Sequence, residues 1–158
     1  EQEFNDDNQV IGVQTTDYSY ALDGLWVGDM PQTSYILGVT LKPIKGLRLQ
    51  ALYKTYDRNF ADWSPDSREI EGDADRTQVW EAPGYSKLDL HASYKLPIKG
   101  YDISLNAHVF NALDDVFVQD AVDNSKYNGY GDKLHLPHNA EVFLGTPRYA
   151  NIGLVVNF

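Results

Sequence analysis

Few side chains in this 158-residue chain have the types and spacings that enzymes or metal sites use. There is no Cys, which excludes disulfides, zinc–thiolate sites and cysteine catalysis. Neither a Gly-x-Ser-x-Gly motif nor a phosphate-binding Gly loop occurs. His135-x-x-His138 supplies half of a metal site, because no third ligand stands at a defined spacing. The sequence therefore predicts no enzymatic activity, no cofactor and no metal site.

One acidic stretch, residues 71–75 (Glu-Gly-Asp-Ala-Asp), places several oxygen ligands close together, as calcium requires. The rest of the twelve-residue EF-hand pattern is missing. We expect this stretch to be a solvated turn rather than a cation site.

Four aromatic side chains in the long polar segments are the candidates for ligand contact: Trp63, Trp80, Tyr127 and Tyr130. They stand beside acids, Gly and Asn, and aromatic planes with neighbouring carboxylates stack on and hydrogen-bond to sugars, peptides or catechol-type ligands. The alternative is that they pack the loops together or line a membrane interface. The sequence leaves both roles open.

The charge of the chain, formally −10, is concentrated in a few segments. Residues 1–33 hold seven acids and no Lys or Arg, and residues 57–84 and 111–145 are also acidic. The segments between them carry eight basic residues against only Asp89 and Asp102. An acidic chain with so few basic clusters argues against nucleic-acid binding, which needs Lys and Arg to displace counterions. Long acidic loops therefore alternate with short, slightly basic segments.

These slightly basic segments alternate apolar and polar residues with period two, which predicts β-strands. We expect antiparallel strands near residues 34–42, 47–56, 86–96, 102–112 and 147–158, a sixth within residues 8–18, and no long helix. Strands of 9–11 residues have the length that crosses a bilayer at the tilt of a barrel.

The connections between the predicted strands alternate in length. The sequence Pro-Ile-Lys-Gly occurs twice, at residues 43–46 and 97–100, and predicts two equivalent hairpin turns. The other connections are roughly thirty residues long. Short turns at one end and long loops at the other are typical of outer-membrane barrels, with short periplasmic turns and long extracellular loops.

Each predicted strand has an aliphatic row and a polar row. The aliphatic row contains Leu49, Ala51, Leu90, Ala92, Leu105, Ala107, Ile152 and Leu154, and the polar row contains Gln50, Asp89, His91, Asn106 and Asn151. In a soluble sheet the aliphatic row would pack inward. In a membrane barrel it would face lipid, and would be exposed when the chain is considered alone. Periodicity by itself does not choose between the two.

The C-terminal residues favour the barrel. Asn151, Gly153, Val156 and Phe158 match the polar-x-Gly-x-x-apolar-x-apolar signal that ends outer-membrane barrels, including the terminal aromatic. A partner protein can recognise an exposed strand edge with alternate apolar side chains by pairing one of its own strands with that edge. We expect these residues to act in assembly by the barrel-assembly machinery rather than in ligand binding, and the final strand to pair with residues 102–111.

The order of several motifs resembles the C-terminal part of a TonB-dependent receptor, an outer-membrane β-barrel transporter. The matching stretches are residues 28–32 (Gly-Asp-Met-Pro-Gln), 42–47 (Lys-Pro-Ile-Lys-Gly-Leu), 56–62, 83–90, 110–117 and 145–149 (Gly-Thr-Pro-Arg-Tyr). Each stretch alone is weak evidence for the family, but together the stretches follow the family's order over nearly the whole chain.

The resemblance implies an all-β fold, with residues 1–158 forming the C-terminal portion of a transmembrane barrel in the outer membrane of a Gram-negative bacterium. It also implies a receptor that binds and imports a nutrient whose identity the sequence does not give. The implied partners are the remaining strands and plug of the same receptor, outer-membrane lipid, the energy-coupling TonB complex through the plug, and a surface lipoprotein. Since five or six strands do not close a barrel, we expect the chain to be a fragment.

A second hypothesis remains from a different class of protein. The same period-two pattern also fits a self-contained soluble β-sheet domain that binds a ligand or partner. Burial of the aliphatic row in a core formed by the chain itself would favour this alternative.

Overall fold

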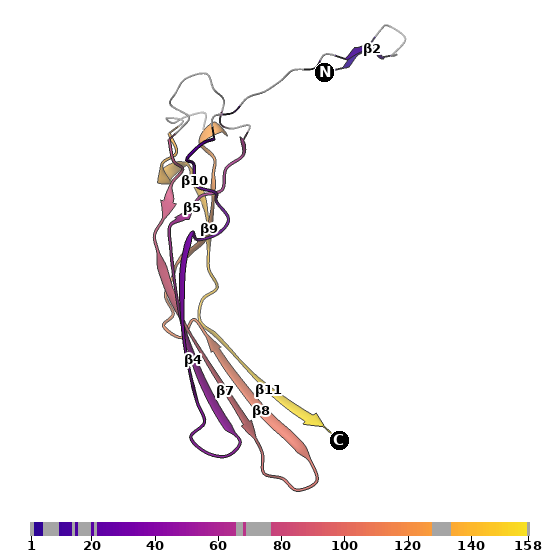
Figure 1. The fold of residues 1–158 in the computed structure, drawn as a ribbon, viewed down its shortest axis with the longest axis vertical. Helices are drawn as coiled ribbons and strands as arrows, with labels where there is room; N and C mark the ends of the chain where they lie inside the picture. Colours follow the sequence, from indigo (N-terminus) through magenta and orange to yellow (C-terminus); the bar gives the residue numbers. More distant parts are fainter. Residues whose placement is uncertain are drawn as a thin grey trace. The chain divides into compact units, whose positions relative to one another are not determined.

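The computed structural model describes residues 2–4, 10–13, 15, 20, 22–65, 68, 77–127 and 134–157 (Figure 1). The chain divides into two compact units: Glu1–Leu25 with Ser64–Thr77, and Trp26–Trp63 with Gln78–Phe158. In the first unit, β1 (Gln2–Phe4) pairs with β2 (Val10–Val13) in a two-stranded antiparallel sheet. The strand predicted within residues 8–18 is therefore present as β2, but it lies outside the main sheet.

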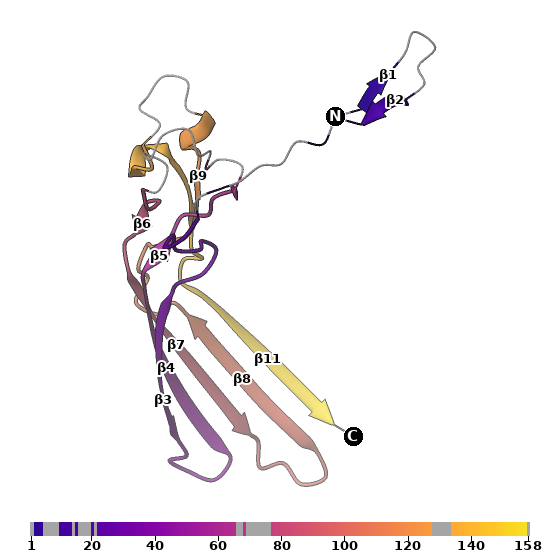
Figure 2. The ribbon, with the colours of Figure 1, turned by 45° about the horizontal axis from the view of Figure 1, so that its top comes forward.

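The second unit contains a five-stranded antiparallel sheet. Its members are β3 (Thr33–Leu41), β4 (Leu47–Asp57), β7 (Tyr85–Lys95), β8 (Asp102–Phe110) and β11 (Tyr149–Asn157), in the order β11-β8-β7-β4-β3. Figure 2 shows these strands side by side as a meander. The predicted all-β class and the five predicted strands are confirmed, with ends that differ by one or two residues.

The register of the sheet explains the period-two pattern of the sequence. Leu49 lies opposite Ala92, Ala92 opposite Ala107, and Ala107 opposite Ile152, so aliphatic side chains from four strands share one face. We call this the aliphatic face. Gln50, His91 and Asn106 lie on the opposite side, which we call the polar face.

The aliphatic face is not packed into a core. Leu90 is 40% exposed, Leu154 63% and Ile152 78%, and Leu49 and Leu105 are also exposed, as the sequence predicts. The Ala side chains of this row are half-buried. Figures 1 and 2 show no helix or second sheet stacked on the five strands within the described part of this unit. The sheet is therefore a single layer.

The two long connections within the second unit carry short strands that the sequence did not predict. Between β4 and β7, β5 (Asn59–Phe60) pairs with β6 (Glu81–Ala82). Between β8 and β11, β9 (Val118–Asp123) pairs with β10 (Ala140–Leu144). The backbone N–H of Asp62 donates to Ala121 O (2.6 Å), and that of Asp123 donates to Asp62 O (2.8 Å), so the two connections are hydrogen-bonded to each other.

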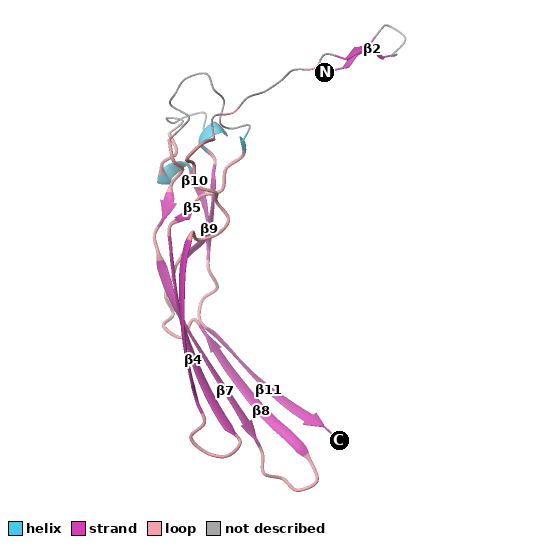
Figure 3. Ribbon diagram, in the orientation of Figure 1, coloured by secondary structure: helices cyan, strands magenta, loops and turns pink. Residues whose placement is uncertain are grey.

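Helical structure in the described residues is limited to short turns such as η3 (Ser125–Tyr127) and η4 (Pro137–Asn139) (Figure 3). None of the helices in these ranges is long and apolar enough to span a membrane.

The buried hydrophobic cluster lies among the connections rather than on the long strands. It consists of Phe60, Ala61, Val79 and Ala121, with Trp63, Trp80 and Val118 packed against it. Because it draws on both long connections, this cluster holds them together at one end of the sheet.

The two Pro-Ile-Lys-Gly turns end in Gly46 and Gly100, whose φ angles of 87° and 85° are unfavourable for any residue with a Cβ. They differ in their surroundings. A Cβ on Gly46 would lie 2.8 Å from Lys95 O, whereas a Cβ on Gly100 would meet nothing within 4 Å.

We predict that Gly46→Ala lowers the stability of the protein more than Gly100→Ala. Both variants carry a left-handed penalty of roughly 1–2 kcal/mol, and Gly46→Ala also displaces the backbone of β7. The urea midpoint of the intact protein measures the difference. Equal midpoints for the two variants would contradict the close approach of the first turn to Lys95.

Candidate functional site

The polar face contains a buried ion pair near the ends of the strands that lead into the long connections. Lys54 Nζ lies 2.8 Å from Asp89 Oδ2, and the backbone N–H of Asn111 donates to Asp89 Oδ1 (3.0 Å). Asp89 is only 4% exposed. A buried carboxylate is tolerated when it is paired and hydrogen-bonded, and here both oxygens have a partner.

Asn111 connects this ion pair to the connection that follows β8. It adopts a positive φ of 48°, where Asn is tolerated, and its side-chain Nδ2 donates to Asp115 O (3.0 Å) and Thr146 O (3.3 Å). The segments that leave β8 and enter β11 are therefore both fixed by one buried amide. Its Oδ1 is buried without a hydrogen-bond partner among the described residues.

A cavity of about 200 Å³ opens beside these groups. Its lining combines ammonium, carboxylate, amide, hydroxyl and aromatic groups: Lys54, Lys87, Asp89, Phe110, Asn111, Phe117, Gln119, Thr146 and Tyr149. Lys87 Nζ lies 5.4 Å from the centroid of the Phe117 ring and 5.7 Å from that of Tyr56, within cation–π range. The charged, amide and hydroxyl groups of this lining can bind a small polar group, so the cavity is a candidate binding site on the polar face.

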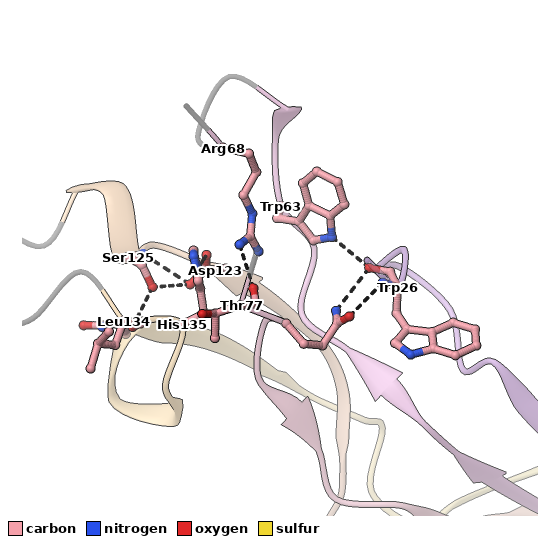
Figure 4. Close-up of polar contacts among 10 residues, drawn as sticks. Trp26, Trp63, Arg68, Thr77, Asp123, Ser125, Leu134 and His135 are labelled. Carbon is pink, nitrogen blue, oxygen red and sulfur yellow. Dashed lines mark hydrogen bonds and ion pairs between the residues drawn. The ribbon is translucent and has the colours of Figure 1, made fainter. Parts of the chain in front are cut away.

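Two of the four predicted ligand-contact residues, Trp63 and Trp80, lie together in the packing of the long connections. Both are partly buried against the cluster of Phe60, Ala61, Val79 and Ala121. Trp63 Nε1 also donates to Trp26 O (2.8 Å; Figure 4). These contacts give the two side chains a structural role, and ligand contact by them stays a prediction.

Of the other two predicted contacts the structure describes only Tyr127, which is not part of this cluster. Tyr127 ends η3 and is 73% exposed, with Lys126 Nζ 6.0 Å from its ring centroid. Tyr130 and residues 71–75 lie outside the described residues.

An aromatic surface that the sequence did not single out is formed around Trp26. Its ring stacks on Phe60 with centroids 5.9 Å apart, and the guanidinium carbon of Arg58 lies 4.3 Å from its centroid. The indole remains 43% exposed. The sequence does not predict the contact between Trp26 and Arg58, because it depends on the folded path of the segment before β3, which passes the end of β4.

A buried polar cluster closes the connection between β9 and β10. Ser125 Oγ donates to Asp123 Oδ1 (2.5 Å) and also lies 2.9 Å from Leu134 O, while His135 Nδ1 lies 2.6 Å from Asp123 Oδ2 (Figure 4). Burial acts to raise the pKa of Asp123, but the hydrogen bonds from His135 and Ser125 outweigh it and leave that pKa below its ordinary value.

This cluster explains the His135-x-x-His138 motif. His135 Nδ1 contacts the carboxylate of Asp123, whereas His138 is an exposed residue of η4. In the described ranges no group of three or more His, Asp or Glu side chains is arranged to hold a metal ion.

Three of the four residues of the predicted assembly signal lie on β11, an edge strand of the five-stranded sheet. Asn151, Gly153 and Val156 lie opposite His108, Asn106 and Ile103 of β8, so the predicted pairing of the final strand is confirmed. All three are exposed, and a Cβ on Gly153 would meet nothing within 4 Å. Phe158 lies outside the described residues.

The comparisons with known proteins identify no relative. The chain matches no family model, no curated protein sequence and no solved structure. Its functional assignment therefore depends on its own residues and geometry.

We predict that Lys54→Met destabilises the protein by roughly 1–3 kcal/mol, because it leaves one oxygen of the buried Asp89 carboxylate without a partner. The matched control is Lys95→Met. Lys95 also pairs with an acid, Asp102, at 2.8 Å, but those side chains are 61% and 48% exposed, so about 0–1 kcal/mol is expected. Urea midpoints of the two variants test the difference, and an equal effect of both would show that the Asp89 pair is not desolvated.

We predict that the cluster around Asp123 opens in acid. Because the folded-state pKa of Asp123 is depressed, its stabilising contribution is complete above the unfolded pKa of about 4 and is lost as pH falls through the lower folded value. Hydrogen exchange of the segments around Ser125 and His135, corrected for intrinsic rates, should accelerate below pH 4. Asp123→Asn should already exchange faster at pH 7, and it should lack this acid-dependent step. Unchanged exchange down to pH 2 would contradict the prediction.

Proposed function

We propose that this chain is the C-terminal section of the barrel of a TonB-dependent outer-membrane receptor, which binds and imports a nutrient. The observation that carries the proposal is the exposed aliphatic face of a single-layer sheet whose opposite face holds a buried ion pair. A soluble sheet normally buries its aliphatic face and solvates its charges. Here the aliphatic face is exposed and an ion pair on the opposite face is largely buried, as expected when lipid lies outside and a polar lumen lies inside.

The dimensions of the strands support the proposal. The five strands are 9–11 residues long, and a transmembrane strand at barrel tilt needs about 9–11 residues. Tight turns join β3 to β4 and β7 to β8, whereas long connections lie at the other end. In the proposed orientation the turns are periplasmic and the long connections extracellular.

The edges of the sheet support a larger assembly. Each of β3 and β11 pairs on one side only within the described structure. Lipid cannot satisfy the backbone groups of a free edge, so in a membrane these edges require further strands. The proposed partners are therefore the remaining barrel strands, together with the plug, the TonB complex and the assembly machinery that the family resemblance implies.

The proposed site of nutrient contact combines the long connections and the adjoining end of the polar face. The 200 Å³ cavity beside Lys54 and Asn111 offers polar contacts, and Trp26 and Tyr127 offer exposed aromatic planes. Polar and aromatic groups of these kinds suit a hydroxylated or amide-containing ligand.

We predict that Leu90→Arg strongly reduces the folded protein in the outer membrane, whereas Gln50→Arg does not. Leu90 lies near the middle of β7 on the aliphatic face, where an Arg facing lipid costs about 2–4 kcal/mol. Gln50 lies opposite His91, the neighbour of Leu90, so it occupies the same level on the polar face. Heat-modifiability of the full-length protein on a gel measures the folded fraction.

The same pair of variants tests the soluble alternative. In a self-contained soluble domain, Arg at the 40% exposed Leu90 would change stability by only about 0.5 kcal/mol. A Leu90→Arg protein that folds as well as Gln50→Arg, and that is extracted without detergent, would overturn the proposed membrane location.

A further inference from the structure

Two of the four histidines of the chain, His91 and His108, form a close pair on the polar face. They are directly opposite residues of β7 and β8. Their Nδ1 atoms lie 2.8 Å apart. Since a hydrogen bond between two imidazole nitrogens needs one protonated and one bare nitrogen, at least one Nδ1 presents a lone pair toward its neighbour.

The separation of the two nitrogens matches one edge of a tetragonal metal site. Adjacent ligands at about 2.0 Å from a metal and 90° apart are about 2.8 Å from each other, the square-planar geometry that Cu²⁺ and Ni²⁺ prefer. In a tetrahedral zinc site with bonds of about 2.0–2.1 Å, the ligands would be about 3.3 Å apart. Once both nitrogens are deprotonated and both rings have turned toward a common point, this separation suits copper(II) better than zinc without movement of the strands.

Neighbouring aromatic rings hold the two imidazoles in place. Phe110 lies edge-on to His91, with centroids 5.5 Å apart and an interplanar angle of 70°, and its centroid lies 6.1 Å from that of His108. Tyr149 in turn stacks on Phe110 at 4.7 Å. Contact with Phe110 limits rotation of both rings, and ligands with restricted rotation lose less conformational entropy when a metal binds.

Space for the remaining ligands exists beside the pair. The two histidines border a cavity of about 440 Å³ whose other lining residues are Arg48, Gln50, Ala92, Ser93, Asn106 and Phe110. The amide oxygens of Gln50 and Asn106, or water, are available to complete the coordination. The charge of Arg48 opposes a bare cation and favours one that also carries an anionic ligand.

We propose that His91 and His108 form a two-histidine site for Cu²⁺ that leaves the other coordination positions open to the cavity. This proposal depends on the register of β7 and β8 and not on the proposed transport function. A metal bound to both strands would also cross-link the centre of the sheet.

The test is a Cu²⁺ titration of the full-length protein in detergent. We expect one tight equivalent whose electron paramagnetic resonance spectrum shows coupling to two imidazole nitrogens. His91→Ala and His108→Ala should each weaken this binding by at least about tenfold. The matched control is His138→Ala, which removes an exposed histidine of η4 and should leave the titration unchanged.

The spectrum of the unaltered protein keeps the test decisive if a variant fails to fold. A first equivalent of Cu²⁺ without imidazole coupling would overturn the proposal. Unchanged affinity in a folded variant that carries both His91→Ala and His108→Ala would also overturn it. A Leu90→Arg protein that folds normally would overturn the proposed membrane location and would leave the copper result unaffected, so the two proposals fail separately.

Discussion

Backbone pairing between β4 and β7, with Gln50 opposite His91 and Ala51 opposite Leu90, separates the aliphatic and polar side chains of this chain. A slip of one residue in that register would move every aliphatic side chain of the strand to the polar face. The pairings of β8 and β11 continue the same separation, so the ion pair, the histidine pair and the exposed aliphatic row all depend on it.

The buried carboxylate of Asp89 links the sheet to the long connections. It pairs with Lys54 of β4 and accepts a hydrogen bond from Asn111, the first residue after β8. Asn111 then binds the segments on either side of β9 and β10 through Asp115 O and Thr146 O. The register of the sheet thus positions the first residues of the connection after β8. Beyond these residues, the cluster around Phe60 and Ala121 holds the two long connections together.

Strand positions were predictable because alternation is a local property of the sequence. The pattern in residues 47–56 needs no partner to be recognised, and the structure places β4 at Leu47–Asp57. β9 was missed because Val118–Asp123 reads Val-Gln-Asp-Ala-Val-Asp, an acidic segment without regular alternation. Its pairing depends on β10, about twenty residues later, which no local pattern reveals.

The candidate site was less predictable than the fold for the same reason. Trp63 and Trp80 were chosen by residue type and location, but their packing against Phe60 and Ala61 depends on contacts between two separate connections. The polar row was visible in the sequence, including Asp89 and His91. The partners of those residues were not, because pairing Asp89 with Lys54 requires the register of β4 against β7.

Polar pairs along β7 become more buried toward the long connections. At the turn end, the side chains of Lys95 and Asp102 are 61% and 48% exposed, whereas the side chains of Lys54 and Asp89 near the other end are 24% and 6% exposed. His91 and His108 lie between these pairs and are half-buried. Because polar interactions strengthen as water is excluded, they should be strongest near Asp89 on this face. Phe117, Gln119 and Thr146, in the connection between β8 and β11, line the cavity beside Asp89, so this connection limits the access of water to that end of the polar face.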